Sequence, residues 1–202
     1  MDEHGRQQFL ANSERLATLI RPLSEPVYQC DCHWIEFESY LARMSEDYGG
    51  VELCPDFQRG HVWSTDQQRH FLENVLKGVV PSAALLVQFN CANWNDPAPD
   101  GELDAGLQCI DGLQRINAVA ALFKGEVQPF GLTVNDLNQS RYSMRGPQFC
   151  FRVAIHAFQY RAELLDYYLA LNAGGTPHSH EEIERVRGLL ALASGARPVR
   201  GA

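Results

Sequence analysis

The stretch IDGLQRINAVAALFKG, residues 110–125, carries the strongest fold signal in the chain. We expect a strand to end near Asp111 and Gly112 and a helix to follow, because apolar residues then recur at the spacing of one helix face: Leu113, Ile116, Val119, Leu122 and Phe123. Arg115 falls in the first turn of that helix. A cation there faces the positive end of the helix dipole, which costs up to about 1 kcal/mol unless a negative group compensates. The sequence therefore predicts a negative partner for Arg115.

Two arrangements would supply that negative group. In the first, the Asp111 carboxylate caps the helix and pairs with Arg115 four residues later. In the second, Asp111, Gln114 and Arg115 stand together at the mouth of a strand-to-helix turn, where free backbone N–H groups and a guanidinium favour a phosphate oxygen. Asp111 would then hold a divalent cation or orient a water, and Gln114 would position that water or a base edge. The residues alone leave both arrangements open.

The size and the charge of the chain narrow the classes of protein to consider. It has 202 residues, of which 45% are hydrophobic, enough to bury the core of one domain with peripheral helices. Its 17 Lys and Arg against 25 Asp and Glu give a net charge of -8, which repels a nucleic-acid backbone at long range. A general DNA-coating protein is therefore not expected. A local basic site for a nucleotide, or for DNA that a partner delivers, stays open.

Membrane, disulfide and zinc proteins are not indicated. The chain has no run of about 20 apolar residues, and its N-terminus, MDEHGRQQ, has no signal pattern, so we predict a cytoplasmic protein without membrane association. Six cysteines without a CxxC pair predict reduced thiols and no structural zinc. The dense group 30–33, CDCH, is interpreted as a strand end or loop. The histidines that lack an adjacent carboxylate or second ligand are not assigned to catalysis: His61, His70, His156, His178 and His180.

The periodicity of the remaining sequence predicts a mixed α+β domain with a small sheet. We expect an amphipathic helix from Phe9 to Ile20, which the RPLSEP stretch ends. Capping boxes at Ser64 and at Ser179 open two more helices. Other helices are expected at 34–49 and 164–171, and strands at 28–32, 84–90, 107–110 and 148–158. In the last strand apolar residues alternate with Cys150, Arg152, Ala154 and His156.

Two further sets of polar residues lie where the chain is expected to come close to a ligand. Gln58 and Arg59 occupy a glycine-containing turn between Phe57 and Trp63, two aromatic residues that we expect to pack in the core. Glycine lets the backbone come close to a ligand there, although plain surface polarity explains the two side chains equally well. Asn172 precedes a Gly-Gly-Thr-Pro run that is predicted to end a helix, so it either caps carbonyl groups or reaches the site.

Three blocks occur in a fixed order: PDFQRGHVW at 55–63, IDGLQR at 110–115 and LNAGGTPHS at 171–179. In that combination they resemble the N-terminal domain of GmrSD-type modification-dependent restriction proteins, a family similar to ParB and sulfiredoxin in fold. The family pattern is a P-x-FQR-x-x-VW block, a strand ending in DGQQR or DGLQR, and an N-x-GG-T-P segment. The resemblance implies a ParB/sulfiredoxin-like α+β domain with a small mixed sheet and flanking helices over 28–193, after a helical extension at 1–27 and before a disordered tail at 194–202.

The resemblance also implies a nucleotide-binding domain, in which the DGQQR-type motif is linked to nucleoside triphosphate hydrolysis and to control of an attached nuclease. By position, Asp111, Gln114 and Arg115 would form the catalytic core, with Asp111 as the candidate ligand of Mg²⁺. The nucleotide and phosphate ligands would be Gln58, Arg59, Gly112, Arg115 and Asn172.

The sequence departs from the family pattern in two ways. Leu113 replaces the first glutamine of DGQQR, which removes one amide, and we predict that it packs in the core because it begins the apolar stripe. The 12 residues after Leu190 are too few for the HNH-type nuclease that the restriction proteins carry, so we expect a stand-alone domain.

The leading hypothesis is a ParB-like domain that binds a nucleoside triphosphate with Mg²⁺, with hydrolysis as a further step, and passes that state to a protein partner or to DNA. The first alternative is a non-enzymatic accessory or anti-defence protein of a phage or mobile element, because compact acidic proteins often dock on basic partners. The second alternative is a DNA-nicking nuclease, as the ParB-like nuclease label often given to such folds suggests. The net charge of -8 disfavours that third hypothesis.

Overall fold

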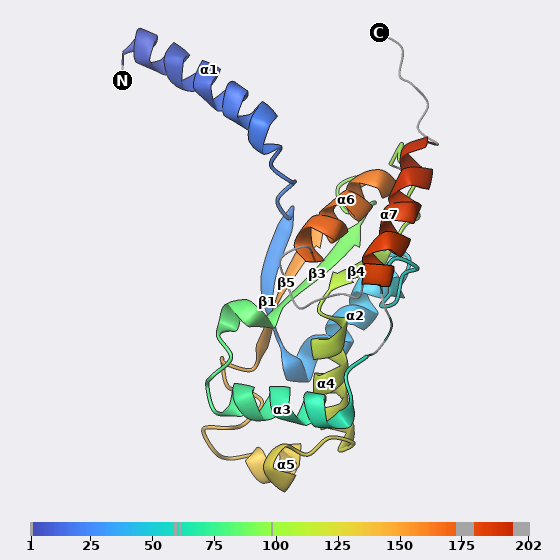
Figure 1. Ribbon diagram of the computed structural model, residues 1–202. Helices are drawn as coiled ribbons and strands as arrows, with labels where there is room; N and C mark the ends of the chain where they lie inside the picture. Colours follow the sequence, from blue (N-terminus) through green and yellow to red (C-terminus); the bar gives the residue numbers. More distant parts are fainter. Residues whose placement is uncertain (1, 59, 61, 98, 173–179, 196–202) are drawn as a thin grey trace.

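The described part of the chain forms a five-stranded sheet with helices on both faces (Figure 1). The computed structural model describes residues 2–58, 60, 62–97, 99–172 and 180–195. Its elements, with η for a 3-10 helix, are in chain order α1 (Glu3–Ile20), β1 (Tyr28–His33), α2 (Trp34–Tyr48), β2 (Val51–Glu52), α3 (Thr65–Leu76), η1 (Ser82–Leu85), β3 (Leu86–Cys91), β4 (Leu107–Asp111), α4 (Leu113–Lys124), η2 (Pro129–Gly131), α5 (Val134–Leu137), β5 (Cys150–His156), α6 (Arg161–Asn172) and α7 (His180–Gly195).

The sheet has the strand order β1-β5-β3-β4-β2. β1 with β5 and β3 with β4 are antiparallel, whereas β5 with β3 and β4 with β2 are parallel. The centre of the sheet thus joins β3 to a strand that lies about sixty residues later in the chain. The predicted α+β class with a small mixed sheet is confirmed.

The larger core lies between the sheet and the helices α2, α3 and α4. Val87 and Phe89 of β3 belong to it, and they pack with residues of all three helices, including Trp34, Leu72 and Leu113. Leu113 is only 3% exposed, so the prediction that it packs inward is confirmed. Because side chains alternate along a strand, the β3 residues that alternate with Val87 and Phe89 point to the opposite face of the sheet.

The smaller core lies on that opposite face, under α6 and α7, which run side by side in Figure 1. It joins Leu165 of α6 and Val186 of α7 to Phe57 and Ile110. Phe57 is 1% exposed, as predicted for a core anchor, and Trp63 packs against Phe71 at a ring-centre distance of 5.4 Å. The turn that contains Gln58 is therefore held between two aromatic contacts.

The predicted helix signals hold at the ends of α2 and α3. Ser64 and Gln67 form the expected capping box at the start of α3. Gly49, in the left-handed region at φ +96°, ends α2, where the Gly-Gly pair predicted a stop. The second predicted capping box, at Ser179, lies outside the described residues.

Three local predictions were wrong. Ser82–Leu85 form a 3-10 helix, so β3 begins at Leu86 and not at Ala84. Phe123 is 37% exposed, so the apolar stripe of α4 ends at Leu122. β5 spans Cys150–His156 and not 148–158, and Ala154 and His156 on its second face are also buried, at 2% and 1%. The second face of the sheet is covered there by α6.

The helix α1 extends away from the sheet and the other helices (Figure 1). None of its residues is buried, and Phe9, Leu10, Leu19 and Ile20 are each more than half exposed. The predicted boundary of the N-terminal extension at residue 27 is not tested by this arrangement. Within the described ranges, no helix has the length and apolar character needed to cross a membrane.

Candidate functional site

A bulge in β4 sets the direction of the Asp111 side chain. Phe89 pairs with Cys109 and the next residue back, Gln88, pairs with Asp111, so β4 contributes the extra residue Ile110 at this point. Cys109 belongs to the larger core and Ile110 to the smaller core. Asp111 is therefore placed opposite Gln88, on the face of the sheet that α6 covers.

The turn from β4 to α4 depends on Gly112. This residue is the N-cap of α4 with φ +105°, a conformation that favours glycine. A Cβ atom here would lie 2.7 Å from Val87 Cγ1 and 3.1 Å from Val87 Cα, so the turn also requires the absence of a side chain. Gly112 has no side chain to cap the helix, and among the described residues the Asp111 carboxylate bonds to Arg115 and not to the first backbone amides of α4.

The negative partner of Arg115 in the structure is Asp111. The guanidinium Nη2 donates a hydrogen bond to Asp111 Oδ2, which is the pairing of the first arrangement. The pair is not closed off, because the Asp111 side chain is 40% exposed and that of Arg115 is 22% exposed. Among the described residues, the buried Arg115 Nε has no acceptor. The guanidinium therefore keeps donor capacity beyond its bond to Asp111.

Two glutamines of the sequence blocks tie the 58–63 turn to β4 and α4. Gln58 Nε2 donates to the carbonyl oxygen atoms of Cys109 and Ile110 over 3.3 and 3.1 Å. Gln114 Oε1 accepts from the amides of Val62 and Trp63, each over 3.1 Å, and its Nε2 donates to the Gly60 carbonyl over 3.0 Å. Both ends of the Gln114 amide are thus engaged with the turn.

Two arginines that the sequence did not single out hold the residues before Gln58. Arg161 Nη2, at the start of α6, donates to both carboxylate oxygens of Asp56 over 2.7 and 2.6 Å. Arg185 of α7 donates to the Phe57 carbonyl over 3.0 Å. The turn is therefore anchored to β4 and α4 on one side and to α6 and α7 on the other.

The structure describes only part of the remaining predicted ligand residues. Arg59 lies outside the described residues, as does the 173–179 run. Asn172 is half-buried at the end of α6, and its Nδ2 donates to the Tyr168 carbonyl over 2.7 Å. Of its two predicted alternatives, the structure shows carbonyl capping.

A polar cluster that the sequence did not assign to the site lies beside Asp111. Gln88 Oε1 accepts from the Tyr167 hydroxyl over 2.7 Å and lies 3.1 Å from His156 Nε2. Gln88 and His156 are 4% and 1% exposed. The sequence contains one sign of this cluster, since a glutamine and an asparagine interrupt the apolar run ALLVQFNC at 84–91. Their hydrogen-bond partners could not be predicted, because they lie more than sixty positions away in the chain.

Burial and charge shift the acidities around this cluster. Burial lowers the pKa of His156 from 6.5 to about 4, so the ring is neutral near pH 7. Its Nε2 therefore carries the proton that faces Gln88 Oε1, since that oxygen only accepts. Burial and the negative charge of Asp111 raise the pKa of Tyr167. Burial also raises the pKa of the Cys109 thiol to about 12, which leaves it protonated and unreactive.

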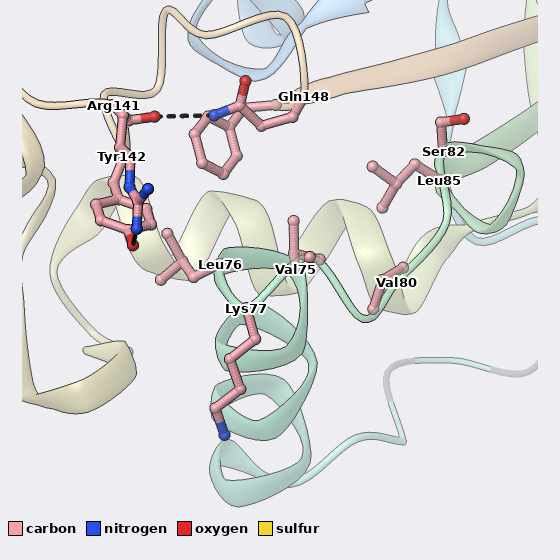
Figure 2. Close-up of a pocket in the computed structure, with 11 residues that line it drawn as sticks. Val75, Leu76, Lys77, Val80, Ser82, Leu85, Arg141, Tyr142 and Gln148 are labelled. Carbon is pink, nitrogen blue, oxygen red and sulfur yellow. Dashed lines mark hydrogen bonds between the residues drawn. The ribbon is translucent and has the colours of Figure 1, made fainter.

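A cavity of about 530 Å³ lies elsewhere, between the end of α3, η1 and the segment before β5 (Figure 2). Val75, Leu85 and Phe149 are among its apolar lining residues. At its edge Gln148 Nε2 donates to the Arg141 carbonyl over 3.0 Å, which Figure 2 shows as a dashed line. None of the site residues predicted from the sequence lines this cavity.

The described residues contain no group of three His, Cys, Asp or Glu side chains placed to hold a metal ion. A Mg²⁺ ion held by Asp111 would therefore take most of its other oxygen ligands from water and phosphate, as Mg²⁺ commonly does.

The comparisons with known proteins give one match. The family model of the GmrSD restriction endonuclease N-terminal domain matches residues 41–184, which contain all three sequence blocks. No curated protein and no solved structure matches the chain, so the likeness to ParB and sulfiredoxin stays a prediction. The matched span is more than half of the 202 residues. The chain therefore belongs to the family of the GmrSD restriction endonuclease N-terminal domain.

Proposed function

We propose that this restriction-related domain binds a nucleoside triphosphate with Mg²⁺ at the turn between β4 and α4. The observation that carries the proposal is the state of Arg115, which lies at the N-terminus of α4 and whose guanidinium Nε has no partner among the described residues. Backbone N–H groups at such a terminus and a nearby guanidinium together favour phosphate oxygens. Family membership supports the proposal, because the DGLQR block lies inside the matched span.

Arg115 and Asp111 would exchange partners when the nucleotide binds. Their ion pair is partly exposed, and such pairs contribute about 1 kcal/mol or less, so a phosphate can replace the Asp111 carboxylate at little cost. The released Asp111 carboxylate would be the protein group that holds a Mg²⁺ ion bound with the phosphates. Arg115 would thus supply the positive charge for the phosphates, and Asp111 would supply the negative charge for the metal ion.

Gln58 and Gln114 act in this proposal as positioning residues. Their amides fix the 58–63 turn against β4 and α4, which sets the distance between the turn and the Arg115 guanidinium. Hydrolysis, the further step, would use a water that Asp111 orients for attack on the terminal phosphorus. The bond from that phosphorus to the bridging oxygen would break, the nucleoside diphosphate would leave, and the water would lose a proton as phosphate forms.

A thermal-shift screen tests the proposal. The wild-type chain is heated with each of the four common ribonucleoside triphosphates, with and without Mg²⁺. At a ligand concentration of about 100 times the dissociation constant, binding stabilises the native state by about 2.7 kcal/mol, so at least one nucleotide should raise the melting temperature by several degrees. An unchanged melting temperature with all four nucleotides at millimolar concentration would count against nucleotide binding.

A second candidate function is protein interaction, and α1 favours it. An isolated helix of this length is marginal in water, yet α1 buries no residue and exposes Phe9, Leu10, Leu19 and Ile20. In this reading the helix would bind a protein partner. Deleting α1 would then abolish partner binding while leaving nucleotide-dependent melting shifts unchanged.

A further inference from the structure

Tyr167 of α6 lies next to the candidate phosphate site. Its hydroxyl donates to Gln88 Oε1 over 2.7 Å, and its ring packs against those of His156 and Phe158 at centre distances of 4.5 and 5.3 Å. Gln88 is in turn the cross-strand partner of Asp111, and residues directly opposed in a sheet have Cβ atoms about 4.5–5.5 Å apart. The half-buried Tyr167 ring is therefore fixed beside Asp111 by contacts from both β3 and β5.

The cluster has hydrogen-bonding capacity that the protein does not use. Within the described part of the chain, both hydrogen bonds of the Gln88 side chain fall on Oε1, which leaves the two hydrogen atoms of Nε2 for another acceptor. His156 Nδ1 is buried and also has no partner among these residues. Polar groups of buried side chains in native proteins are nearly always paired, so the free Gln88 amide nitrogen, on a side chain that is only 4% exposed, favours a polar guest at this position.

We propose that Tyr167 and Gln88 recognise the base of the nucleotide whose phosphates lie at Arg115. The exposed part of the Tyr167 ring offers a surface on which a planar base stacks. The Tyr167 hydroxyl and the Gln88 amide then meet the carbonyl and amino groups at the edge of the base. His156 is a positioning residue, because its Nε2 proton holds Gln88 Oε1 and so turns the amide nitrogen outward from the ring.

This inference rests on the proposed function, and it can be tested separately from it. The full chain is titrated calorimetrically with inorganic tripolyphosphate and with each common nucleoside triphosphate, all with Mg²⁺. Tripolyphosphate reports on the phosphate end of the site alone. The ratio of its dissociation constant to that of the preferred nucleotide measures what the nucleoside adds, and we expect at least about a tenfold preference for the nucleotide in the wild type.

Tyr167→Phe keeps the ring and removes the hydroxyl. We expect it to lower the preference ratio by about three- to tenfold, the usual effect of one lost hydrogen bond, while the dissociation constant of tripolyphosphate stays unchanged. Gln88→Met, of similar volume, is the second variant if Tyr167→Phe folds poorly. Tyr142→Phe is the matched control, because that hydroxyl contacts Arg141 at the edge of the separate cavity, and it should change neither constant.

The outcomes separate the two claims. Equal affinity of the wild type for tripolyphosphate and every nucleotide would overturn base recognition and leave the phosphate site standing. An unchanged ratio in both Tyr167→Phe and Gln88→Met would do the same. Absence of binding to all of the probes would refute the proposed function, and base recognition with it.

Discussion

At the residue scale, Arg115 lies in the first turn of α4, where the helix dipole disfavours a cation, and Asp111 supplies the compensating charge from the end of β4. The two residues are four positions apart, and the turn at Gly112 brings the Asp111 carboxylate within hydrogen-bond reach of the guanidinium. Their partial exposure keeps the net interaction small. The ion pair therefore balances the charge of Arg115 in the unliganded protein, and its small interaction energy leaves Arg115 available to a ligand.

A double-mutant cycle measures how tightly the pair is bound. We expect Asp111→Ala, Arg115→Ala and the double variant to give a coupling free energy of unfolding of about 1 kcal/mol or less by urea denaturation, because both side chains contact solvent. A coupling of about 3 kcal/mol would instead identify a structural bridge and favour the interaction-module hypothesis.

His156 makes the stability depend on pH. Its pKa is lowered by burial to about 4, whereas the unfolded chain binds the proton near pH 6.5, so the native state loses stability as the pH falls from 6.5 towards 4. The loss between pH 7 and pH 5 should be about 2 kcal/mol in the free energy of unfolding.

His156→Gln should remove most of that pH dependence. His70→Gln, which alters an exposed histidine on α3, should retain it. An identical pH slope in the wild type and His156→Gln would show that other groups cause the acid sensitivity.

Some of these contacts could be predicted from the sequence and others could not, because only contacts between residues close in the chain leave a pattern in it. The Asp111–Arg115 pairing was one of two open arrangements, because the two residues are only four positions apart in the sequence. The partners of Gln58, Gln114 and Gln88 lie more than fifty positions away, and local spacing contains no information on such contacts. Gln114 was accordingly assigned to water or a base edge, whereas the structure shows both ends of its amide holding the 60–63 turn.

At the element scale, the sequence predicted the end of α2 and the starts of α3 and α4, because glycines and capping residues act locally. The bulge at Ile110 was not predictable, since LQCID reads as a regular strand and the extra residue is defined only by its pairing with β3. Residues 84 and 85, the second half of the 3-10 helix, were likewise predicted as strand, because a short apolar run does not distinguish a strand from a helical turn.

The two glycines that flank α4 give a matched prediction. Gly125→Ala places a Cβ in open space at φ +75°, so only the left-handed backbone opposes it, at about 1–2 kcal/mol. Gly112→Ala adds a 2.7 Å contact with Val87, so it should cost about 2–5 kcal/mol in the free energy of unfolding. Equal losses of stability in the two variants would contradict the close packing of the β4–α4 turn against β3.

At the whole-molecule scale, the sheet and the helices α2 to α7 hold the described core, and α1 contributes nothing to it. The α+β class was predictable from periodicity, and the family from three ordered blocks. The strand order was not predictable, since the central pairing of β3 with β5 joins segments that no local pattern connects.

Deleting residues 1–24 tests the independence of α1. The melting temperature should change by less than about 2 °C, because α1 buries no side chain and the deletion leaves the Val27 amide bonded to Ile155. A fall of 5 °C or more, in differential scanning calorimetry of both proteins at equal concentration, would mean that α1 packs on the body in solution.

The central claim is that the Arg115 guanidinium binds the phosphates of a nucleotide, and calorimetric titration of one nucleoside triphosphate with Mg²⁺ into three proteins tests it most directly. The wild type and Arg15→Ala, which loses the same charge from the remote helix α1, should bind alike. Arg115→Ala should lose at least about tenfold in affinity while its melting temperature stays within about 3 °C of the wild type. Equal affinity of Arg115→Ala and the wild type, or no binding by the wild type, would contradict the claim.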